Sequence, residues 1–205
     1  MTDTKPTILE VTNNSDNSPG ESVIPGSLRD AINKSQSTDG GKYNIRFKVP
    51  SGSEGDPLLG TGYFTIRLKQ PLPNIYRNEV LFNPENGPVA SVTLLPGEFK
   101  DSVKTPQAQI QNESSGIGDP SGSLMYIGDV NLIHDNQLSK SYSGQPPVVS
   151  INNFNFVKNI AKGGTGERGA GGAVGVGGGI TFSAGHLTIK RSIFQDLIAQ
   201  GGGVS

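Results

Sequence analysis

The side chains best suited to chemistry lie in the segment "GDVNLIHDN", which contains Asp129, His134 and Asp135. Carboxylates and an imidazole can exchange protons with a substrate, and carboxylate oxygens can bind Ca²⁺. His134 and Asp135 are adjacent, however, so on a strand their side chains point to opposite faces. We therefore interpret this segment as a polar turn and keep a catalytic role as the alternative.

A second polar group lies in "GHLTIKR", where His186, Lys190 and Arg191 are close together in the sequence. This group could bind a saccharide, or it could be outward-facing charge that keeps the protein soluble. The Glu167–Arg168 pair lies in a glycine-rich segment and is interpreted as a solvated ion pair. We assign no catalytic role to either group.

The sequence lacks the motifs of nucleotide-binding, Ca²⁺-binding and hydrolase sites. The segment "GAGGAVGVGG" is similar to a phosphate-binding loop, but it lacks the Gly-Lys-Ser/Thr ending and a following helix. The glycine- and aspartate-rich nonapeptide that binds Ca²⁺ is absent, and no Ser, His and Asp have the arrangement of a hydrolase. The chain has no cysteine, which excludes disulfides and thiolate metal sites. The sequence therefore predicts no catalytic residue, no metal ligand and no cofactor.

Charge and composition argue against two classes of partner. The 205 residues have a formal net charge of −1, so no electrostatic attraction to nucleic acid or to an anionic membrane is expected. No apolar run approaches the ~18 residues of a membrane span. Glycine accounts for 29 residues, and 14 of these follow Lys162, so turns are concentrated in the last third of the chain.

One short helix is expected at 27–36, within the segment "SVIPGSLRDAINKSQ". Ser27 is a suitable N-cap, and Asp30 follows at the spacing of a capping box. The apolar stripe of this helix consists of Leu28, Ala31 and Ile32, and Arg29, Asn33 and Lys34 fall largely on the other side. A helix this short needs packing to be stable, and its single stripe suits it to cover an edge or an end.

Most of the remaining chain alternates apolar and polar residues with a period of two, which predicts half-buried strands. The pattern is clearest in "YNIRFKVP" and "YFTIRLKQPLP", where proline ends each run. Further strands are expected in "TKPTILEVT", "NEVLFNP", "ASVTLLPG" and "SLMYIGDVNLI". The stretch at about 98–122 is polar and has little periodicity, so it predicts a surface loop or insertion.

The last third of the chain contains an internal repeat with an offset of 38 residues. The segment "VVSINNFNFVKNIAKGG" at 148–164 aligns with "HLTIKRSIFQDLIAQGG" at 186–202. The matched positions are apolar residues or glycine: Val149 with Leu187, Ile151 with Ile189, Phe156 with Phe194, Ile160–Ala161 with Ile198–Ala199, and Gly163–Gly164 with Gly201–Gly202. Repeats of this size indicate stacked units, each too small to bury its own core.

Short apolar strands between glycine and asparagine turns, with no helices among them, indicate a β-solenoid. Its strands stack in parallel about 4.8 Å apart, and equivalent side chains form ladders inside. Asn152 and Asn153, or Asn155 and Asn159, are candidates for tight left-handed corners, and the paired glycines could adopt positive φ. An open end of the stack exposes backbone and core, so we expect the 27–36 helix to cover the N-terminal end.

Several motifs of the chain also occur together in one family. The opening consists of "VTNNSDNSPGESVIPGSLRDAINKSQ" and "GGKYNIRFKVP", followed by "TIRL" at 65–68 and "LPNI" at 72–75. Later segments match the family motifs F-x-x-N at 156–159, L-T-I at 187–189 and S-x-F at 192–194. The family motif G-G-A-I is present as G-G-A-V at 171–174. The chain thereby resembles bacterial surface proteins of the pectin-lyase-like superfamily, including adhesin-like and polymorphic outer-membrane proteins. It departs from them at Gly26, where a cysteine is common, and at 194–197, where the second F-x-x-N motif is lost.

The resemblance implies an all-β chain that forms a right-handed parallel β-helix with a short N-terminal capping helix. We expect residues 1–50 to form the cap and residues 51–205 to form the coils, with the insertion at about 98–122. The chain is expected to be part of a longer protein. The resemblance also implies a bacterial protein that is extracellular or held at the cell surface.

Three functions stay open at this point. The first is a non-catalytic module, structural or adhesive, that presents loops to a surface, a glycan or a protein partner. The second, which occurs among proteins of this fold, is a lyase or hydrolase acting on an acidic polysaccharide with residues contributed by different coils. The third is an assembly module whose open C-terminal end associates with another copy. The lack of a catalytic cluster favours the first, so we lean towards a protein that is not an enzyme.

Overall fold

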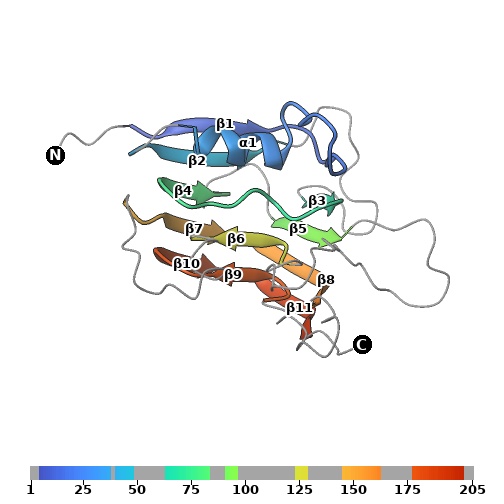
Figure 1. Cartoon of the computed structure of the whole chain (residues 1–205). Helices are drawn as coiled ribbons and strands as arrows, with labels where there is room; N and C mark the ends of the chain where they lie inside the picture. Colours follow the sequence, from blue (N-terminus) through green and yellow to red (C-terminus); the bar gives the residue numbers. More distant parts are fainter. Residues whose placement is uncertain are drawn as a thin grey trace, which may run out of the picture.

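The computed structural model describes residues 5–37, 40–48, 63–83, 91–96, 123–128, 145–162 and 177–200 (Figure 1). Within these residues the regular structure is β-strand, apart from one short helix near the N-terminus. The loop predicted at about 98–122 lies outside the described residues, and so do the paired glycines of the repeat.

The described strands form three sheets, and all their pairings are parallel. The first sheet has the order β1 (Thr7–Val11), β2 (Lys42–Phe47), β4 (Glu79–Phe82), β7 (Val148–Asn152) and β10 (His186–Lys190). The second sheet has the order β11 (Ile193–Gln200), β8 (Phe154–Lys162), β5 (Ser91–Pro96) and β3 (Tyr63–Leu68). The third sheet pairs β6 (Met125–Ile127) with β9 (Ile180–Phe182), and Ile75 forms a bridge to Ile127.

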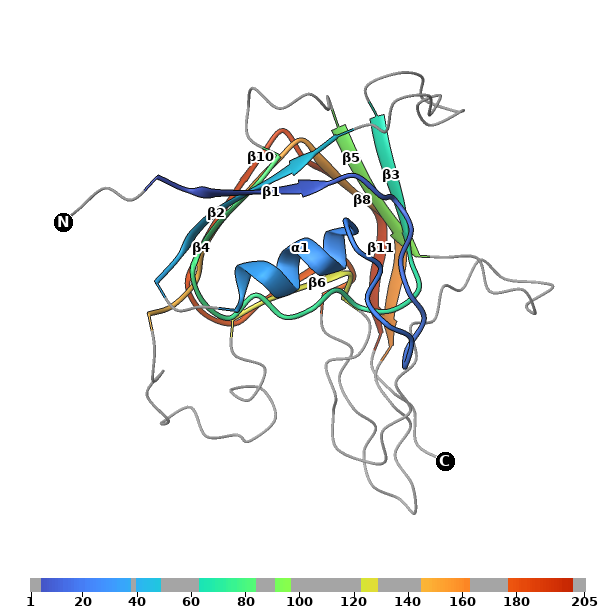
Figure 2. The same cartoon turned by 90° about the horizontal axis from the view of Figure 1, so that it is seen from above.

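The chain passes through the three sheets in the same order each time. From β4 it runs to β5 in the second sheet and β6 in the third, and it then returns to the first sheet at β7, beside β4. It repeats this path through β8 and β9 to β10. We call one such passage a circuit; circuits lie one below another in Figure 1 and surround a shared interior in Figure 2. The prediction of an all-β chain with parallel strands and one short helix is therefore confirmed for the described residues.

The last two circuits pair in the register of the sequence repeat. Ile151 pairs with Ile189 in the first sheet, and Phe156 pairs with Phe194 in the second, at the predicted offset of 38 residues. The same offset joins Val149 to Leu187, Ile160 to Ile198 and Ala161 to Ala199. Because both sheets share one offset, side chains of equivalent position stack directly over one another.

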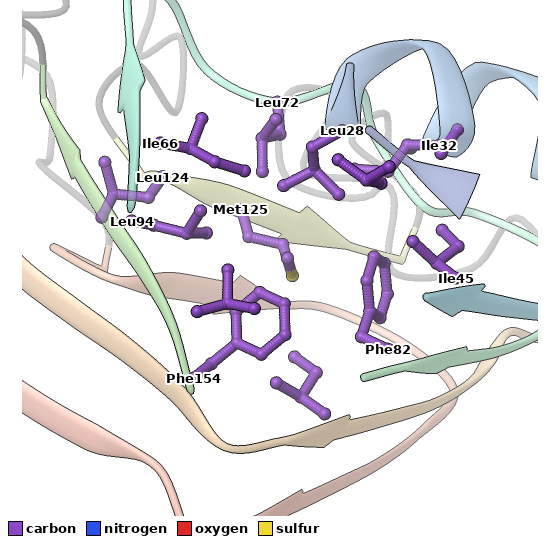
Figure 3. Packing of buried hydrophobic residues seen from close by; sticks show 14 of the residues in the cluster. Leu28, Ile32, Ile45, Ile66, Leu72, Phe82, Leu94, Leu124, Met125 and Phe154 are labelled. Carbon is purple, nitrogen blue, oxygen red and sulfur yellow. The ribbon is translucent and has the colours of Figure 1, made fainter. Parts of the chain in front are cut away.

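Phenylalanine rings form a column through the interior. The ring centroids of Phe47 and Phe154 are 5.5 Å apart, and those of Phe82 and Phe154 are 6.0 Å apart, both with edge-to-face contact. Phe156 continues the column and stacks on Phe194 with 4.9 Å between centroids. Aliphatic and methionine side chains from all three sheets fill the space around the rings (Figure 3). The circuits therefore share one apolar core.

The corner between the first and second sheets uses a left-handed residue. Asn153 has a φ of 55°, and Arg191, one repeat later, has a φ of 51°. Asn83 occupies the corresponding end of β4 with a φ of 47°. The prediction of a left-handed corner is confirmed at Asn153, whereas Asn152 ends β7 and does not adopt this conformation. Asparagine is favoured here because its short polar side chain tolerates the left-handed region.

The alternative corner at Asn155 and Asn159 is wrong. Both residues lie in β8, and the left-handed residue of that strand is Lys158, with a φ of 55°, matched by Asp196 of β11 with a φ of 54°. The two asparagines instead use their side-chain amides in hydrogen bonds between segments; Asn159 donates to the Gly178 carbonyl oxygen at 2.6 Å. Composition alone does not distinguish a corner residue from one whose amide links two segments.

The predicted helix is present as α1 (Leu28–Ser35), with Ser27 as its N-cap. The Ser27 hydroxyl accepts a hydrogen bond from the backbone N–H of Asp30 at 3.2 Å. The Asp30 carboxylate accepts one from the N–H of Gly26 at 2.9 Å and also pairs with Lys34 at 2.7 Å. The reciprocal bond of the capping box therefore reaches the residue before the N-cap.

Gly26 enters the helix through a conformation that suits glycine. Its φ is 73°, and a Cβ at this position would lie 2.6 Å from the Thr12 hydroxyl oxygen. Its carbonyl oxygen accepts hydrogen bonds from the N–H groups of Thr12 and Asn13, at 2.9 and 3.1 Å. The backbone of the segment after β1 is thereby held against the start of α1, which leaves no room for a side chain at Gly26.

Arg29 does not lie on the exposed side of α1, contrary to the prediction. Its guanidinium is buried and donates two hydrogen bonds to the Asp16 carboxylate, at 2.8 and 2.9 Å. It also donates to the carbonyl oxygens of Gln70 and Pro71, at 2.9 and 2.7 Å, while the N–H of Lys69 donates to Asp16 at 3.0 Å. The helical pattern could not reveal these partners, because they come from two distant loops.

α1 lies across the N-terminal end of the interior (Figure 2). Leu28, Ala31 and Ile32 are buried in the core cluster. In Figure 3 the side chain of Leu28 lies close to Leu72, and Ile32 extends from the same face of the helix. The helix therefore covers the apolar column at this end of the stack.

We predict that Arg29→Ala lowers the free energy of unfolding by about 3–5 kcal/mol, because it leaves the buried Asp16 carboxylate without its charged partner. The matched control is Lys34→Ala on the same helix, where the side chain is exposed and the expected loss is less than about 0.5 kcal/mol. Urea unfolding followed by circular dichroism measures both. Equal losses for the two variants would contradict the buried pair as the main link between α1 and the sheets.

A second prediction concerns pH. Burial raises the pKa of Asp30, but the hydrogen bonds from Lys34 and Gly26 outweigh burial, so the pKa lies below its ordinary value of 3.8. Because the pKa is lower in the folded state, the ionised carboxylate stabilises the fold above the unfolded-state pKa, and this contribution disappears as pH falls through the folded-state pKa. We expect Asp30→Asn to lower the melting temperature at about pH 7 and to match the unmodified protein at about pH 2.

The control for this titration is Glu10→Gln, which removes one negative charge from the exposed side of β1. Its melting temperature should stay within about 1 °C of the unmodified protein at neutral pH, because the pair of Glu10 with Lys48 is solvated. A melting temperature of Asp30→Asn that differs from the unmodified protein by the same amount at both pH values would show that the Asp30 charge is not involved.

Candidate functional site

The structure places the predicted basic group along one strand and the corner that follows it. His186 begins β10, Lys190 ends it, and Arg191 is the left-handed corner residue. All three residues are exposed. Four residue steps along a strand separate His186 from Lys190 by about 13 Å. The structure therefore brings Lys190 and Arg191 together and leaves His186 at the other end of the strand.

The other residues singled out from the sequence lie outside the described residues. These are Asp129, His134 and Asp135, together with the Glu167–Arg168 pair. Of the glycine-rich segment 169–178, the structure describes the last two residues. Their proposed roles stay predictions.

Two kinds of feature are absent from the part of the chain that the structure describes. No group of three or more His, Cys, Asp or Glu side chains in that part is placed to hold a metal ion. No helix found there has both the length and the apolar character required to cross a membrane.

A row of small polar side chains crosses the circuits on the outer face of the second sheet. The Asn155 side-chain amide donates hydrogen bonds to the hydroxyl oxygens of Ser91, at 2.9 Å, and Thr93, at 3.3 Å. Thr65 of β3 pairs in register with Thr93 of β5. Their neighbours along the strands, such as Val92, are buried in the core, so these polar side chains face outward. We call Thr65, Ser91, Thr93 and Asn155 the polar row.

The polar row can exchange hydrogen bonds with a ligand. Hydroxyl and amide groups are both donors and acceptors, and neither carries a charge. The register of the sheet continues the row from Asn155 to Ile193, whose side chain is 56% exposed. Hydroxyl groups beside an apolar side chain suit a ligand that presents both C–H surface and hydroxyl groups, as sugars do.

The outer face of the first sheet is different, because it carries charged pairs. Lys42 of β2 and Glu79 of β4 are 3.3 Å apart across the strands. Lys48 and Glu10 are 3.9 Å apart on the neighbouring pair of strands. All four side chains are well exposed, so these pairs contribute little to stability and act mainly as a solvated surface.

Sequence reasoning missed the polar row. Ser91 and Thr93 alternate with apolar residues in "ASVTLLPG", which correctly predicts that they face outward. The sequence suggests a corner at Asn155 rather than a strand. Its contact with Ser91 spans 64 residues of chain, and no pattern in the sequence aligns these two strands. The alternation was the available signal, and the partner strand could not be read from it.

The geometry of the polar row does not by itself identify a relative of known activity. Comparison of the chain with protein-family models, with curated proteins and with solved structures found no match.

Proposed function

We propose that the described circuits are coils of a right-handed parallel β-helix. The repeated order of the three sheets and their parallel pairing support this interpretation. A connection that returns a strand parallel to an earlier strand of the same sheet is right-handed in nearly all proteins, because of the twist of the strands. The motifs shared with pectin-lyase-like proteins support the same architecture.

We further propose that this β-helix is a non-catalytic module, structural or adhesive, at the surface of a bacterial cell. The polar row is the observation that carries the proposal. Its hydroxyl and amide groups can hold a ligand by hydrogen bonds, but they do not supply the pair of carboxyl groups that glycosidic cleavage uses. An outer surface of this kind is suited to binding rather than to bond breaking.

The ligand class that fits the polar row is a neutral glycan. The row presents hydroxyl and amide groups in a line across successive strands, about 4.8 Å apart, and Ile193 extends it with apolar surface. A polymer of sugars could lie along this line and repeat its contacts from strand to strand. Because a single hydrogen bond of this kind contributes little, affinity would come from several contacts at once.

We predict that Asn155→Ala weakens binding to neutral glycans about tenfold, because it removes the amide that aligns the hydroxyl groups of Ser91 and Thr93. The matched control is Asn44→Ala, which changes a half-buried asparagine on the outer face of the first sheet. It should alter binding less than about twofold. A glycan array identifies the ligand, and biolayer interferometry measures the affinities. Equal weakening by both variants would contradict the polar row as the binding surface.

A turnover assay separates binding from catalysis. The protein is incubated with polygalacturonate, alginate and the glycans retained on the array. We expect neither the ultraviolet absorbance of unsaturated uronate ends nor an increase in reducing ends, since lyase action creates the first and hydrolysis the second. Either product, proportional to protein concentration, would contradict the non-catalytic proposal and support the polysaccharide lyase or hydrolase.

A further inference from the structure

The polar row has a parallel neighbour on the outer face of the second sheet. Two positions further along the strands, Arg67 of β3 pairs in register with Leu95 of β5. Val157 of β8 pairs in the same way with Gln195 of β11, and the register between β5 and β8 places Leu95 beside Val157. We call Arg67, Leu95, Val157 and Gln195 the second row.

The middle of the second row is apolar. Leu94 is fully buried, so Leu95, the next residue of β5, faces outward. Val157 faces outward for the same reason, because Phe156 before it is fully buried. Both outward side chains are half-buried, and neither belongs to the apolar core cluster. The second sheet therefore carries a short apolar surface on its outer face.

The two ends of the second row carry hydrogen-bond donors. The Arg67 guanidinium donates through several N–H groups, and the Gln195 amide both donates and accepts. Both side chains are exposed, and their strands, β3 and β11, stand at opposite ends of the strand order of this sheet. A ligand lying along the row therefore meets polar groups at both ends and apolar side chains between them.

The second row and the polar row are two parallel lines. The strands β3, β5, β8 and β11 lie one below another in Figure 1, so both lines cross the strands and run along the stack. Two residues along a strand separate the lines by about 6.6 Å, and the four strands give each line a length of about 14 Å. An apolar surface thus lies directly beside a line of hydroxyl and amide groups.

We infer that the two rows together bind a flat, neutral, β-1,4-linked glucan, an inference that rests on the proposed function and narrows its ligand class. In such a glucan the hydroxyl groups and linkage oxygens are equatorial. Its C–H groups therefore point to the two faces of a ribbon, and its hydroxyl groups lie along the edges. One face packs on Leu95 and Val157, and one edge exchanges hydrogen bonds with the polar row.

The linkage of the sugars decides whether both rows are used. An α-1,4-linked glucan contains the same sugar, but its axial linkage oxygen makes the chain coil. A coiled chain cannot keep one face on the second row and one edge on the polar row over four strands. A single sugar is too short to reach from Arg67 to Gln195, so affinity depends on an oligosaccharide that spans the row.

Isothermal titration calorimetry of the unmodified protein with cellohexaose and maltohexaose tests the inference. Both ligands are glucose hexamers, so they match in composition and differ in linkage. We expect cellohexaose to bind at least about tenfold more tightly, because its flat ribbon contacts both rows. Cellobiose should bind more weakly than cellohexaose, because it is shorter than the row. Equal affinities for the two hexamers would overturn the inference.

Leu95→Ser tests the apolar surface. It should weaken cellohexaose binding about tenfold, because it removes an apolar contact with the sugar face. The matched control is Leu81→Ser, which changes a half-buried leucine on the outer face of the first sheet, between the buried Val80 and Phe82. It should alter binding less than about twofold. Thermal melting followed by circular dichroism checks that both variants fold, and Val157→Ala replaces Leu95→Ser if that variant does not.

The outcomes separate this inference from the proposed function. If Asn155→Ala weakens glycan binding and Leu95→Ser does not, glycan binding stands and the second row is not part of the site. If polygalacturonate binds in preference to cellohexaose and is released at about 0.5 M NaCl, Arg67 recognises an acid group and the neutral ligand is wrong. If no glycan binds, the proposed function fails and the inference fails with it.

Discussion

Each circuit of this chain buries its apolar side chains against one another and against the circuits above and below it. A single passage through three short strands is too small to bury a core of its own, so stability depends on stacking in register. This constraint explains why Ile151 pairs with Ile189 and Phe156 with Phe194 at one common offset. A slip by one residue would turn every inward side chain outward and break the column of phenylalanine rings.

Stacking in register does not by itself bury the apolar side chains at the two ends of the stack. At the N-terminal end α1 covers them, and the buried pair of Arg29 with Asp16 holds the helix in place. The charges are compensated, because Arg29 also donates to two carbonyl oxygens and Asp16 also accepts from a backbone N–H. One ion pair thereby connects the loop after β1, the helix and the segment after β3. Among the residues that the structure describes, no helix with such an ion pair lies over the last circuit, where Phe182 and Phe194 are exposed.

The need to stack in register restricts the inward residues much more than the residues on the outer surface of the sheets. Outward positions do not contribute to the apolar column, so their residue types can vary without disturbing the stack. The second sheet uses them for the polar row, and the first sheet uses them for solvated pairs such as Lys42 with Glu79. A function carried by such positions comes from residues on several strands, which explains why no single segment of the sequence contains a recognisable site.

The sequence by itself determined the elements and the pairing of the last two circuits. The strand pattern located β1 to β6, the Ser27 and Asp30 spacing located α1, and the repeat predicted the pairing of Ile151 with Ile189. These are local or periodic properties, and a sequence contains them directly. The tertiary structure decided the contacts between segments whose sequences share no pattern. It buried Arg29 against Asp16, placed the left-handed residue of β8 at Lys158 rather than Asn159, and joined Asn155 to Ser91 across 64 residues. Long connections of unequal length separate these partners, so only the folded chain brings them within hydrogen-bond distance.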